Sequence, residues 1–124
     1  MPVESPTRPS LWLDALPALE RRPALSSDLE ADVVIVGGGF SGLWTAYYLL
    51  QHDPGLGVVV LEAEYAGFGA SGRNGGWVTS GMSLSPATLA DRYGADGART
   101  VIDAMREAVD EVGRVASLEG IDCD

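Results

Sequence analysis

Two short apolar runs, at residues 32–36 and 58–61, consist almost entirely of valine, isoleucine and leucine. Uninterrupted runs of this length and composition are typical of strands that are buried on both faces of a parallel sheet. Between them, apolar residues recur at helical spacing from about 39 to 52, and Asp53, Pro54 and Gly55 end the predicted helix. The order strand, helix, strand predicts a parallel βαβ unit and an α/β fold class.

The second half of the chain has a helical pattern throughout. Ser85 suits the cap of a helix and Pro86 its first position. We therefore expect a short helix that begins at Pro86 and ends near Tyr93. A longer amphipathic helix is expected from about 95 to 118, with Gly120 as its cap. Its apolar stripe consists of Val101, Met105, Val109, Val112 and Ala116. Residues 77–79 are expected to form either a short strand or an extended segment.

The first 30 residues contain five of the seven prolines and cannot form one regular helix. Leu11, Trp12, Leu13 and Leu16 are expected to dock this arm on the surface of a domain, with Trp12 as a packing anchor. The sequence is therefore divided into a proline-rich arm at 1–30 and a domain that begins at residue 31 and continues to 124.

Gly37, Gly39 and Gly42 follow the first predicted strand and open the helix. In this arrangement Gly37 permits a tight turn, Gly39 leaves room for a pyrophosphate, and Gly42 lets the helix lie close to the sheet. Ala46 continues that close contact one helical turn later. The N–H groups of the first turn lack intrahelical acceptors and, together with the helix dipole, attract phosphate. This spacing predicts a dinucleotide site.

Glu62 ends the second predicted strand, about 20 residues after Gly42. A carboxylate in that position accepts hydrogen bonds from ribose hydroxyls and repels a 2′-phosphate, which disfavours NADP. The alternative is an ordinary βαβ turn with an incidental glutamate at the strand end. The fingerprint alone does not distinguish FAD from NAD.

A second glycine-dense stretch at 65–76 follows Glu62 directly. It offers many backbone N–H groups and little steric bulk, so it can follow an extended cofactor beyond the ribose. From composition alone, a flexible surface loop is an equal alternative.

Residues 34–43, 60–63 and 69–76 together resemble the FAD-dependent amino-acid and amine oxidoreductases of the D-amino-acid oxidase-like superfamily. The block from Gly69 to Gly76 is most similar to the gamma-glutamylputrescine oxidoreductase-like branch, and so is the leader at 10–14. The resemblance extends over about residues 10–82. It implies a partial Rossmann-like FAD-binding domain, the beginning of a doubly wound sheet that stops before the substrate domain.

The resemblance also implies an enzyme whose flavin accepts a hydride from the carbon next to the nitrogen of an amine or amino acid. The imine product would hydrolyse, and the reduced flavin would pass its electrons to oxygen or another acceptor. Residues 69–76 lack the His or Cys that some relatives use to attach the flavin, so a non-covalent FAD is expected.

Site residues follow from the same resemblance, position by position. The pyrophosphate is expected at Gly37, Gly39, Phe40, Ser41 and Gly42, and the adenosine ribose at Glu62 and Ala63. The residues expected to follow the cofactor towards the flavin are Gly69, Ala70, Ser71, Arg73, Asn74 and Gly75. Arg73 is alternatively a surface charge or a phosphate partner. No catalytic residue can be named in this chain.

The chain has 8 basic and 18 acidic residues, a net charge of −10, which argues against nucleic acid or an anionic membrane surface as a partner. No apolar run approaches the roughly 18 residues of a membrane span, and the amino terminus lacks a signal pattern. A single cysteine, Cys123, excludes an internal disulfide framework, and no His/Cys spacing predicts a metal site. These features predict a cytoplasmic protein. The resemblance implies a small-molecule amine or amino-acid substrate.

Two parallel strands do not complete a doubly wound sheet. We therefore expect the chain to be the amino-terminal part of a longer enzyme and inactive alone. Two alternatives remain open: another flavoprotein class, such as a hydroxylase, and a non-catalytic nucleotide-binding remnant. A remnant is expected to lose a fingerprint residue, whereas Gly37, Gly39, Gly42 and Glu62 are all present.

Overall fold

The computed structural model describes residues 10–14 and 21–123, and all structural statements below concern these residues. The chain forms two compact units, Met1–Gly75 and Gly76–Asp124, which are described separately. The first unit contains α1 (Leu11–Asp14), β1 (Val33–Val36), α2 (Phe40–His52), β2 (Val58–Leu61) and the short 3₁₀ helix η1 (Ala70–Gly72). The second unit contains α3 (Pro86–Leu118).

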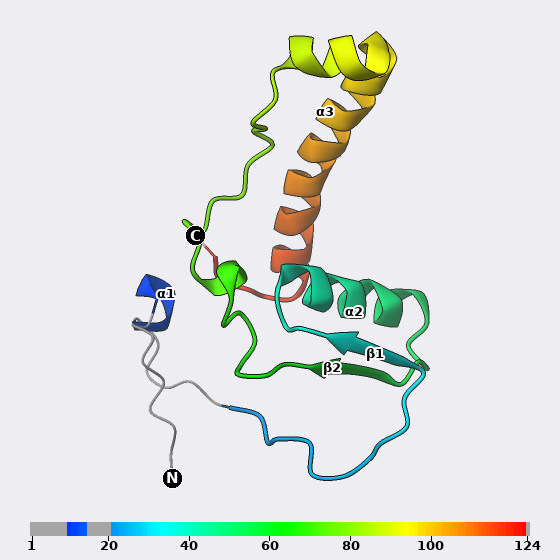
Figure 1. The fold of residues 1–124 in the computed structure, drawn as a ribbon, viewed down its shortest axis with the longest axis vertical. Helices are drawn as coiled ribbons and strands as arrows, with labels where there is room; N and C mark the ends of the chain where they lie inside the picture. Colours follow the sequence, from blue (N-terminus) through cyan, green and yellow to red (C-terminus); the bar gives the residue numbers. More distant parts are fainter. Residues whose placement is uncertain (1–9, 15–20, 124) are drawn as a thin grey trace. The chain divides into compact units, whose positions relative to one another are not determined.

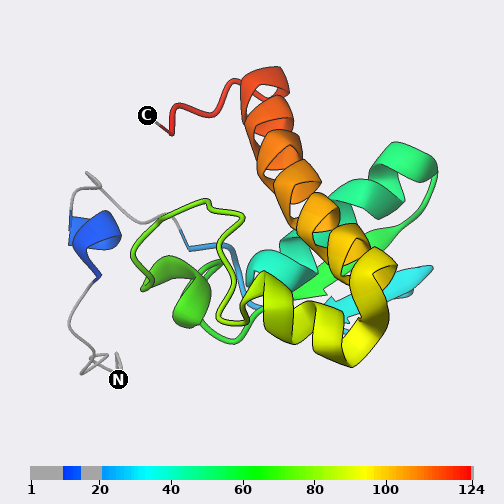
Figure 2. The same cartoon turned by 90° about the horizontal axis from the view of Figure 1, so that it is seen from above.

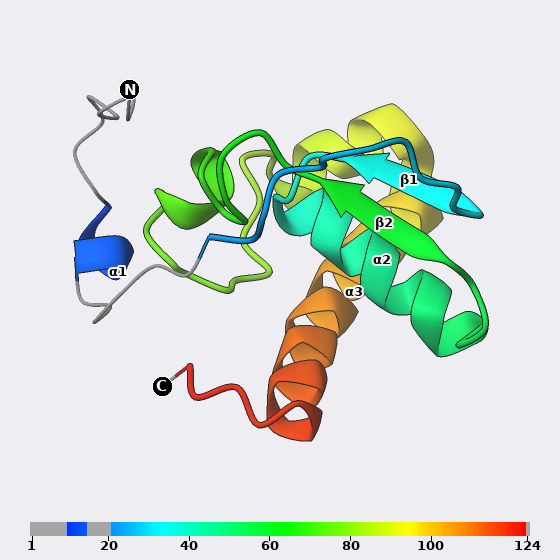
Figure 3. The same ribbon diagram turned by 90° about the horizontal axis from the view of Figure 1, so that it is seen from below.

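A parallel βαβ unit forms the centre of the first unit, as the sequence predicts. β1 and β2 pair in parallel, with Val33 opposite Val58 and Val36 opposite Leu61. In Figure 1 the two arrowheads point the same way, and α2 lies over one face of the strand pair; Figure 3 shows the same arrangement from below. The pairing continues into the turn after β1, where the Gly37 N–H donates to the Leu61 carbonyl oxygen at 2.7 Å.

The two faces of β1 differ in burial. Val33 and Ile35 are half-buried and face α2, whereas the side chains of Val34 and Val36 are 52% and 86% exposed. One face of β1 therefore lacks a covering element within the described part of this unit. The reason is that α2 covers only one face of a sheet that has two strands here.

The boundaries of α2 agree with the predicted start and stop signals. The helix begins directly after Gly39 and ends at His52. At its end, the Asp53 N–H donates to the Leu49 carbonyl oxygen at 2.8 Å, and the Gly55 N–H donates to Asp53 Oδ1 at 2.9 Å. The aspartate thus closes the helix and opens the following turn.

The arm preceding β1 is attached to the first unit. α1 is a single helical turn, and Trp12 Nε1 donates to the Asn74 carbonyl oxygen at 2.9 Å. This hydrogen bond links α1 to Asn74, while Trp12 is 49% exposed, so its role as a packing anchor stays a prediction. Leu16, which was expected to dock as well, lies outside the described residues.

In the second unit, α3 is divided at Gly94, whose φ of 75° and ψ of 168° are not helical. Figure 2 shows the resulting bend in α3, and the two arms correspond to the two helices that the sequence predicts. Ser85 Oγ accepts a hydrogen bond from the Thr88 N–H at 3.1 Å, as an N-cap does. At the other end Gly120 has a φ of 64°, and the Ile121 N–H donates to the Ala116 carbonyl oxygen at 2.8 Å.

Burial along α3 follows the predicted apolar stripe only in part. Val101, Met105, Val109 and Val112 are half-buried, and Ala116 is buried. The remaining buried residues, which the stripe did not include, are Leu89, Ala98 and Val115. Residues 77–79 do not form a strand, and Trp77 is 89% exposed. Among the described residues, none of the helices has the length and apolar character to cross a membrane.

Candidate coenzyme site

The turn between β1 and α2 needs glycine at two positions for geometric reasons. Gly37 has a φ of 103°, in the left-handed region that other residues rarely adopt. A Cβ on Gly42 would overlap the Gly37 carbonyl oxygen and would lie 3.2 Å from Ile35 Cγ2. The absence of a side chain at Gly42 therefore allows α2 to pack against β1, as predicted.

Gly39 has a different neighbour from the one that the sequence suggests. A Cβ at this position would lie 2.9 Å from Ser71 Oγ, which is closer than carbon and oxygen atoms normally approach. The same hydroxyl accepts a hydrogen bond from the Phe40 N–H at 2.9 Å. Ser71 thus satisfies one of the N–H groups at the start of α2 from a position 31 residues further along the chain.

The second glycine-rich stretch folds back onto the turn after β1. The Gly67 N–H donates to the Gly38 carbonyl oxygen at 2.9 Å, and Gly38 is buried beneath this contact. Ser71 and Gly72 are half-buried. The structure therefore brings together the two blocks that the sequence assigned to one cofactor, and residues 67–72 do not form a free surface loop.

Glu62 lies directly after β2 with both carboxylate oxygens engaged by the backbone. The Gly38 N–H donates to Oε2 at 2.7 Å, and the Glu64 N–H donates to Oε1 at 3.1 Å. These hydrogen bonds, above all the one from Gly38, lower the pKa of Glu62. Each carboxylate oxygen can accept a second hydrogen bond, so the exposed Glu62 can still receive ribose hydroxyls.

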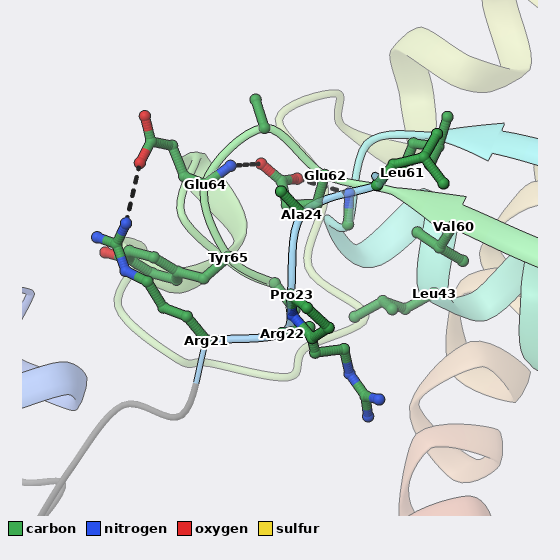
Figure 4. Close-up of a pocket in the computed structure, with 14 residues that line it drawn as sticks. Arg21, Arg22, Pro23, Ala24, Leu43, Val60, Leu61, Glu62, Glu64 and Tyr65 are labelled. Carbon is green, nitrogen blue, oxygen red and sulfur yellow. Dashed lines mark hydrogen bonds and ion pairs between the residues drawn. The ribbon is translucent and has the colours of Figure 1, made fainter. Parts of the chain in front are cut away.

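A cavity of about 490 Å³ opens beside Glu62 (Figure 4). One wall comes from Gly38, Leu43 and residues 60–66, at the carboxyl end of β2. The opposite wall comes from residues 21–25 of the arm, which the sequence did not assign to the site. Two adjacent arginines in a strongly acidic chain, Arg21 and Arg22, were the signal that could have drawn attention to this segment.

The remaining predicted site residues are distributed around this turn. Ala63 lines the cavity, while Phe40 and Ser41 are exposed at the start of α2. Within the second block, the Arg73 guanidinium lies over the Phe68 ring at 4.6 Å from its centroid. Asn74 Nδ2 donates to the carbonyl oxygens of Ala70 at 3.1 Å and Ser71 at 2.8 Å. The side chains of Arg73 and Asn74 therefore stabilise the conformation of the second block.

The remaining members of the second block are Gly69 and Gly75. A Cβ added to either of them meets no atom within 4 Å. These two positions therefore leave open space beside the backbone, and the structure offers no steric reason for glycine there.

The geometry fits the adenosine and pyrophosphate part of a dinucleotide. The cavity lies at the carboxyl end of a parallel strand, an acid stands at its edge, and a glycine turn opens a helix beside it. The residues that the structure describes include no group of three or more His, Cys, Asp or Glu side chains that could hold a metal ion. The arrangement is that of a Rossmann-like coenzyme-binding unit.

Comparison with known proteins defines the family. The family model of FAD dependent oxidoreductases matches residues 32–124. The chain therefore belongs to this family, whose cofactor is FAD, and its α/β fold is the one that the sequence predicts.

Three curated relatives illustrate the range of the family. Gamma-glutamylputrescine oxidoreductase of Escherichia coli is 40% identical over 81% of this chain, which corresponds to 23% of the relative. Sarcosine oxidase subunit beta of Rhizobium meliloti is 56% identical over 35% of this chain and 10% of the relative. The mitochondrial L-2-hydroxyglutarate dehydrogenase of Pongo abelii is 38% identical over 66% of this chain and 20% of the relative.

The chain thus spans less than a quarter of the length of each of these relatives. No solved structure matches the chain at a significant level.

Proposed function

We propose that the protein to which this chain contributes the coenzyme-binding part oxidises a carbon–nitrogen bond in a small amine or amino acid. When bound, FAD supplies the ring that accepts a hydride from the carbon next to nitrogen. The imine product would hydrolyse to a carbonyl compound and the free amine or ammonia, and bound FAD would supply the two-electron transfer to an external acceptor.

The observation that carries this proposal is the joining of the two glycine-rich blocks at Ser71 and Phe40. The second block carries the resemblance to amine and amino-acid oxidoreductases, and it is hydrogen-bonded to the glycine turn that opens α2. The names of two relatives refer to amine substrates, gamma-glutamylputrescine and sarcosine.

In this proposal the residues of the site have separate tasks. Gly37, Gly39, Phe40, Ser41 and Gly42 surround the pyrophosphate. Glu62 and Ala63 hold the adenosine ribose, and residues 69–75 lead towards the flavin. Since this block contains neither His nor Cys, the flavin is held without a covalent bond. We assign residues 1–30 to a proline-rich arm, and the domain that begins at residue 31 to the amino-terminal part of the FAD-binding domain.

A second candidate is oxidation of a 2-hydroxy acid at a carbon–oxygen bond. It is favoured by the 38% identity to L-2-hydroxyglutarate dehydrogenase, which extends over two thirds of this chain. The proposed coenzyme site is compatible with both reactions because none of its residues is assigned to the substrate.

Anaerobic reduction of the FAD-loaded full-length protein tests the proposal. Primary and secondary amines, amino acids and 2-hydroxy acids are added separately, and bleaching of the flavin absorbance is followed. We expect bleaching with at least one amine or amino acid, together with a carbonyl product. Bleaching by 2-hydroxy acids alone supports the second candidate, and a protein that retains no FAD contradicts both.

A further inference from the structure

The arm that precedes β1 contacts the coenzyme-binding edge of the first unit at two separate places. Trp12 Nε1 donates to the Asn74 carbonyl oxygen in the second glycine-rich block. Further along, the Arg21 guanidinium lies 3.8 Å from Glu64 Oε2 and 5.7 Å from the centroid of the Tyr65 ring. Both places lie on the stretch that follows β2, so the arm runs beside the predicted site.

Arg21 makes these contacts from a segment without regular secondary structure. Figure 4 shows its side chain extended along Tyr65 towards Glu64, while Arg22 points away from them. Tyr65 is itself fixed by an edge-to-face contact with Phe68, at 5.2 Å between ring centroids. The arginine therefore joins the arm to a braced aromatic residue and a carboxylate.

The chemistry of the cavity suits a purine nucleoside. Pro23 and Leu25 from the arm, together with Leu43 and Val60 from the βαβ unit, give it apolar walls that suit a flat ring. Glu62 at its edge is the expected acceptor for ribose hydroxyls. The cavity thus has a place for each half of adenosine.

We propose that residues 21–25 form the outer wall of the adenosine end of the FAD site, with Arg21 as the positioning residue that fastens this wall to Glu64 and Tyr65. The inference rests on the proposed coenzyme site and adds a segment that neither glycine-rich block contains. In the bound state the wall covers the adenosine, and FAD leaves the site only when the Arg21 contacts open.

Trypsin provides a direct test because the sequence has no lysine and places Arg21 and Arg22 side by side. Proline follows Arg22, so cleavage in the wall is confined to the Arg21–Arg22 bond. The full-length protein is digested without ligand and with saturating FAD, ADP or FMN, and the fragment that begins at Arg22 is measured by mass spectrometry. Cleavage after Arg114 in α3 serves as the internal control for general stabilisation.

We expect FAD and ADP to slow cleavage after Arg21 by about tenfold or more, because proteolysis follows the population of the open segment. FMN lacks adenosine and is expected to change the rate by less than about twofold. Cleavage after Arg114 should change less than cleavage after Arg21. Equal protection by FMN, or unchanged cleavage when fluorescence quenching shows that FAD is bound, overturns the inference. Failure to bind FAD at all removes the proposed coenzyme site as well.

A charge exchange tests the role of Arg21 itself. R21E is expected to speed FAD release from the holoprotein about threefold to tenfold, and the double variant R21E/E64R is expected to restore the original rate. Glu64 contacts Glu62 through its backbone N–H, so replacing its side chain leaves that hydrogen bond in place. R99E, with the same change of net charge on α3, is the matched control. Release rates that do not distinguish R21E from R99E contradict the assignment.

Discussion

Residues 37–42 and 67–72 share the pattern Gly-x-Gly-x-Ser-Gly and have similar backbone turns. The first glycine of each has a left-handed φ, 103° at Gly37 and 81° at Gly67. In each, a Cβ on the last glycine, Gly42 or Gly72, would overlap the carbonyl oxygen of the first. The same six-residue pattern therefore produces the same close approach twice.

The two blocks differ in the helix that follows the turn. The first opens α2, which has 13 residues, whereas the second opens η1, which has only 3 residues. Only the longer helix combines free N–H groups with an appreciable dipole, so only the first block has the electrostatics of a phosphate site. The serine of the second block instead caps the helix of the first. A shared turn pattern thus does not imply a shared task.

The largest effect is expected from adding a Cβ to Gly42, the last glycine of the first block. Gly42→Ala should lower the free energy of unfolding by about 2–3 kcal/mol and prevent FAD retention, because a backbone oxygen cannot move aside as a side chain can. Gly72→Ala has the same collision in a shorter element and should cost about 1 kcal/mol. Urea unfolding of the full-length protein, with flavin fluorescence for FAD, measures both.

Gly69→Ala is the matched control for this comparison. Gly69 has a negative φ, and an added Cβ meets no atom within 4 Å, so the change should stay within about 0.5 kcal/mol. A loss at Gly72 as large as that at Gly42 would show that the second turn is as important for the fold as the first.

The pH dependence of FAD binding should depend on Glu62, whose carboxylate links the first turn to β2. Its pKa is lower in the folded than in the unfolded chain because the Gly38 and Glu64 N–H groups bind the charged form. The stabilising contribution is therefore complete above the ordinary glutamate pKa of about 4.3 and is lost as the pH falls through the folded value. The free energy of unfolding should therefore fall across this acidic range, and the FAD dissociation constant should rise because a protonated carboxyl is a weaker acceptor for ribose hydroxyls.

Glu62→Gln separates this effect from general acid unfolding. It should weaken FAD binding at neutral pH by about tenfold, since hydrogen bonds to a charged acceptor are lost. The part of the pH dependence that is due to Glu62 should then disappear. An unchanged acidic profile in this variant would assign the dependence to other groups.

Ser71→Ala tests the link between the two blocks. Loss of the hydroxyl that accepts the Phe40 N–H should lower stability by about 1 kcal/mol, as removal of a helix cap does. Ser80→Ala, in the extended segment of the second unit, controls for loss of an exposed hydroxyl. Thermal or urea unfolding gives both values, and equal small losses would mean that the second block does not contribute a cap.

The smallest effect on stability is expected at Arg73, whose guanidinium lies over the Phe68 ring. Arg73→Gln should cost about 0.5 kcal/mol, the contribution of an exposed cation–π contact, with little change in FAD affinity. Fluorescence titration with FAD measures the affinity. A loss of affinity of about tenfold at unchanged stability would assign Arg73 to the flavin instead.

Local rules determined much of this fold. The β-branched runs predicted β1 and β2, the Asp53–Gly55 turn predicted the end of α2, and Ser85 and Gly120 predicted the limits of α3. The position of each of these strands and helix ends depends on the propensities and capping residues of a few neighbouring positions. Such local features can be recognised in the sequence alone. The glycine spacing likewise predicted the turn at which Gly42 packs against Gly37.

Tertiary structure decided which distant residues complete the site. Ser71 reaches Phe40, Glu62 reaches Gly38, and residues 21–25 form a cavity wall opposite residues 60–66. These contacts join residues that are far apart in the chain, and their side chains have several possible partners until the backbone has folded. The sequence by itself determined β1, α2, β2, the helices of the second unit and the glycine turn that opens α2. Chain folding decided which side chains border the cavity, because position in space is a property of the whole chain and not of a local pattern.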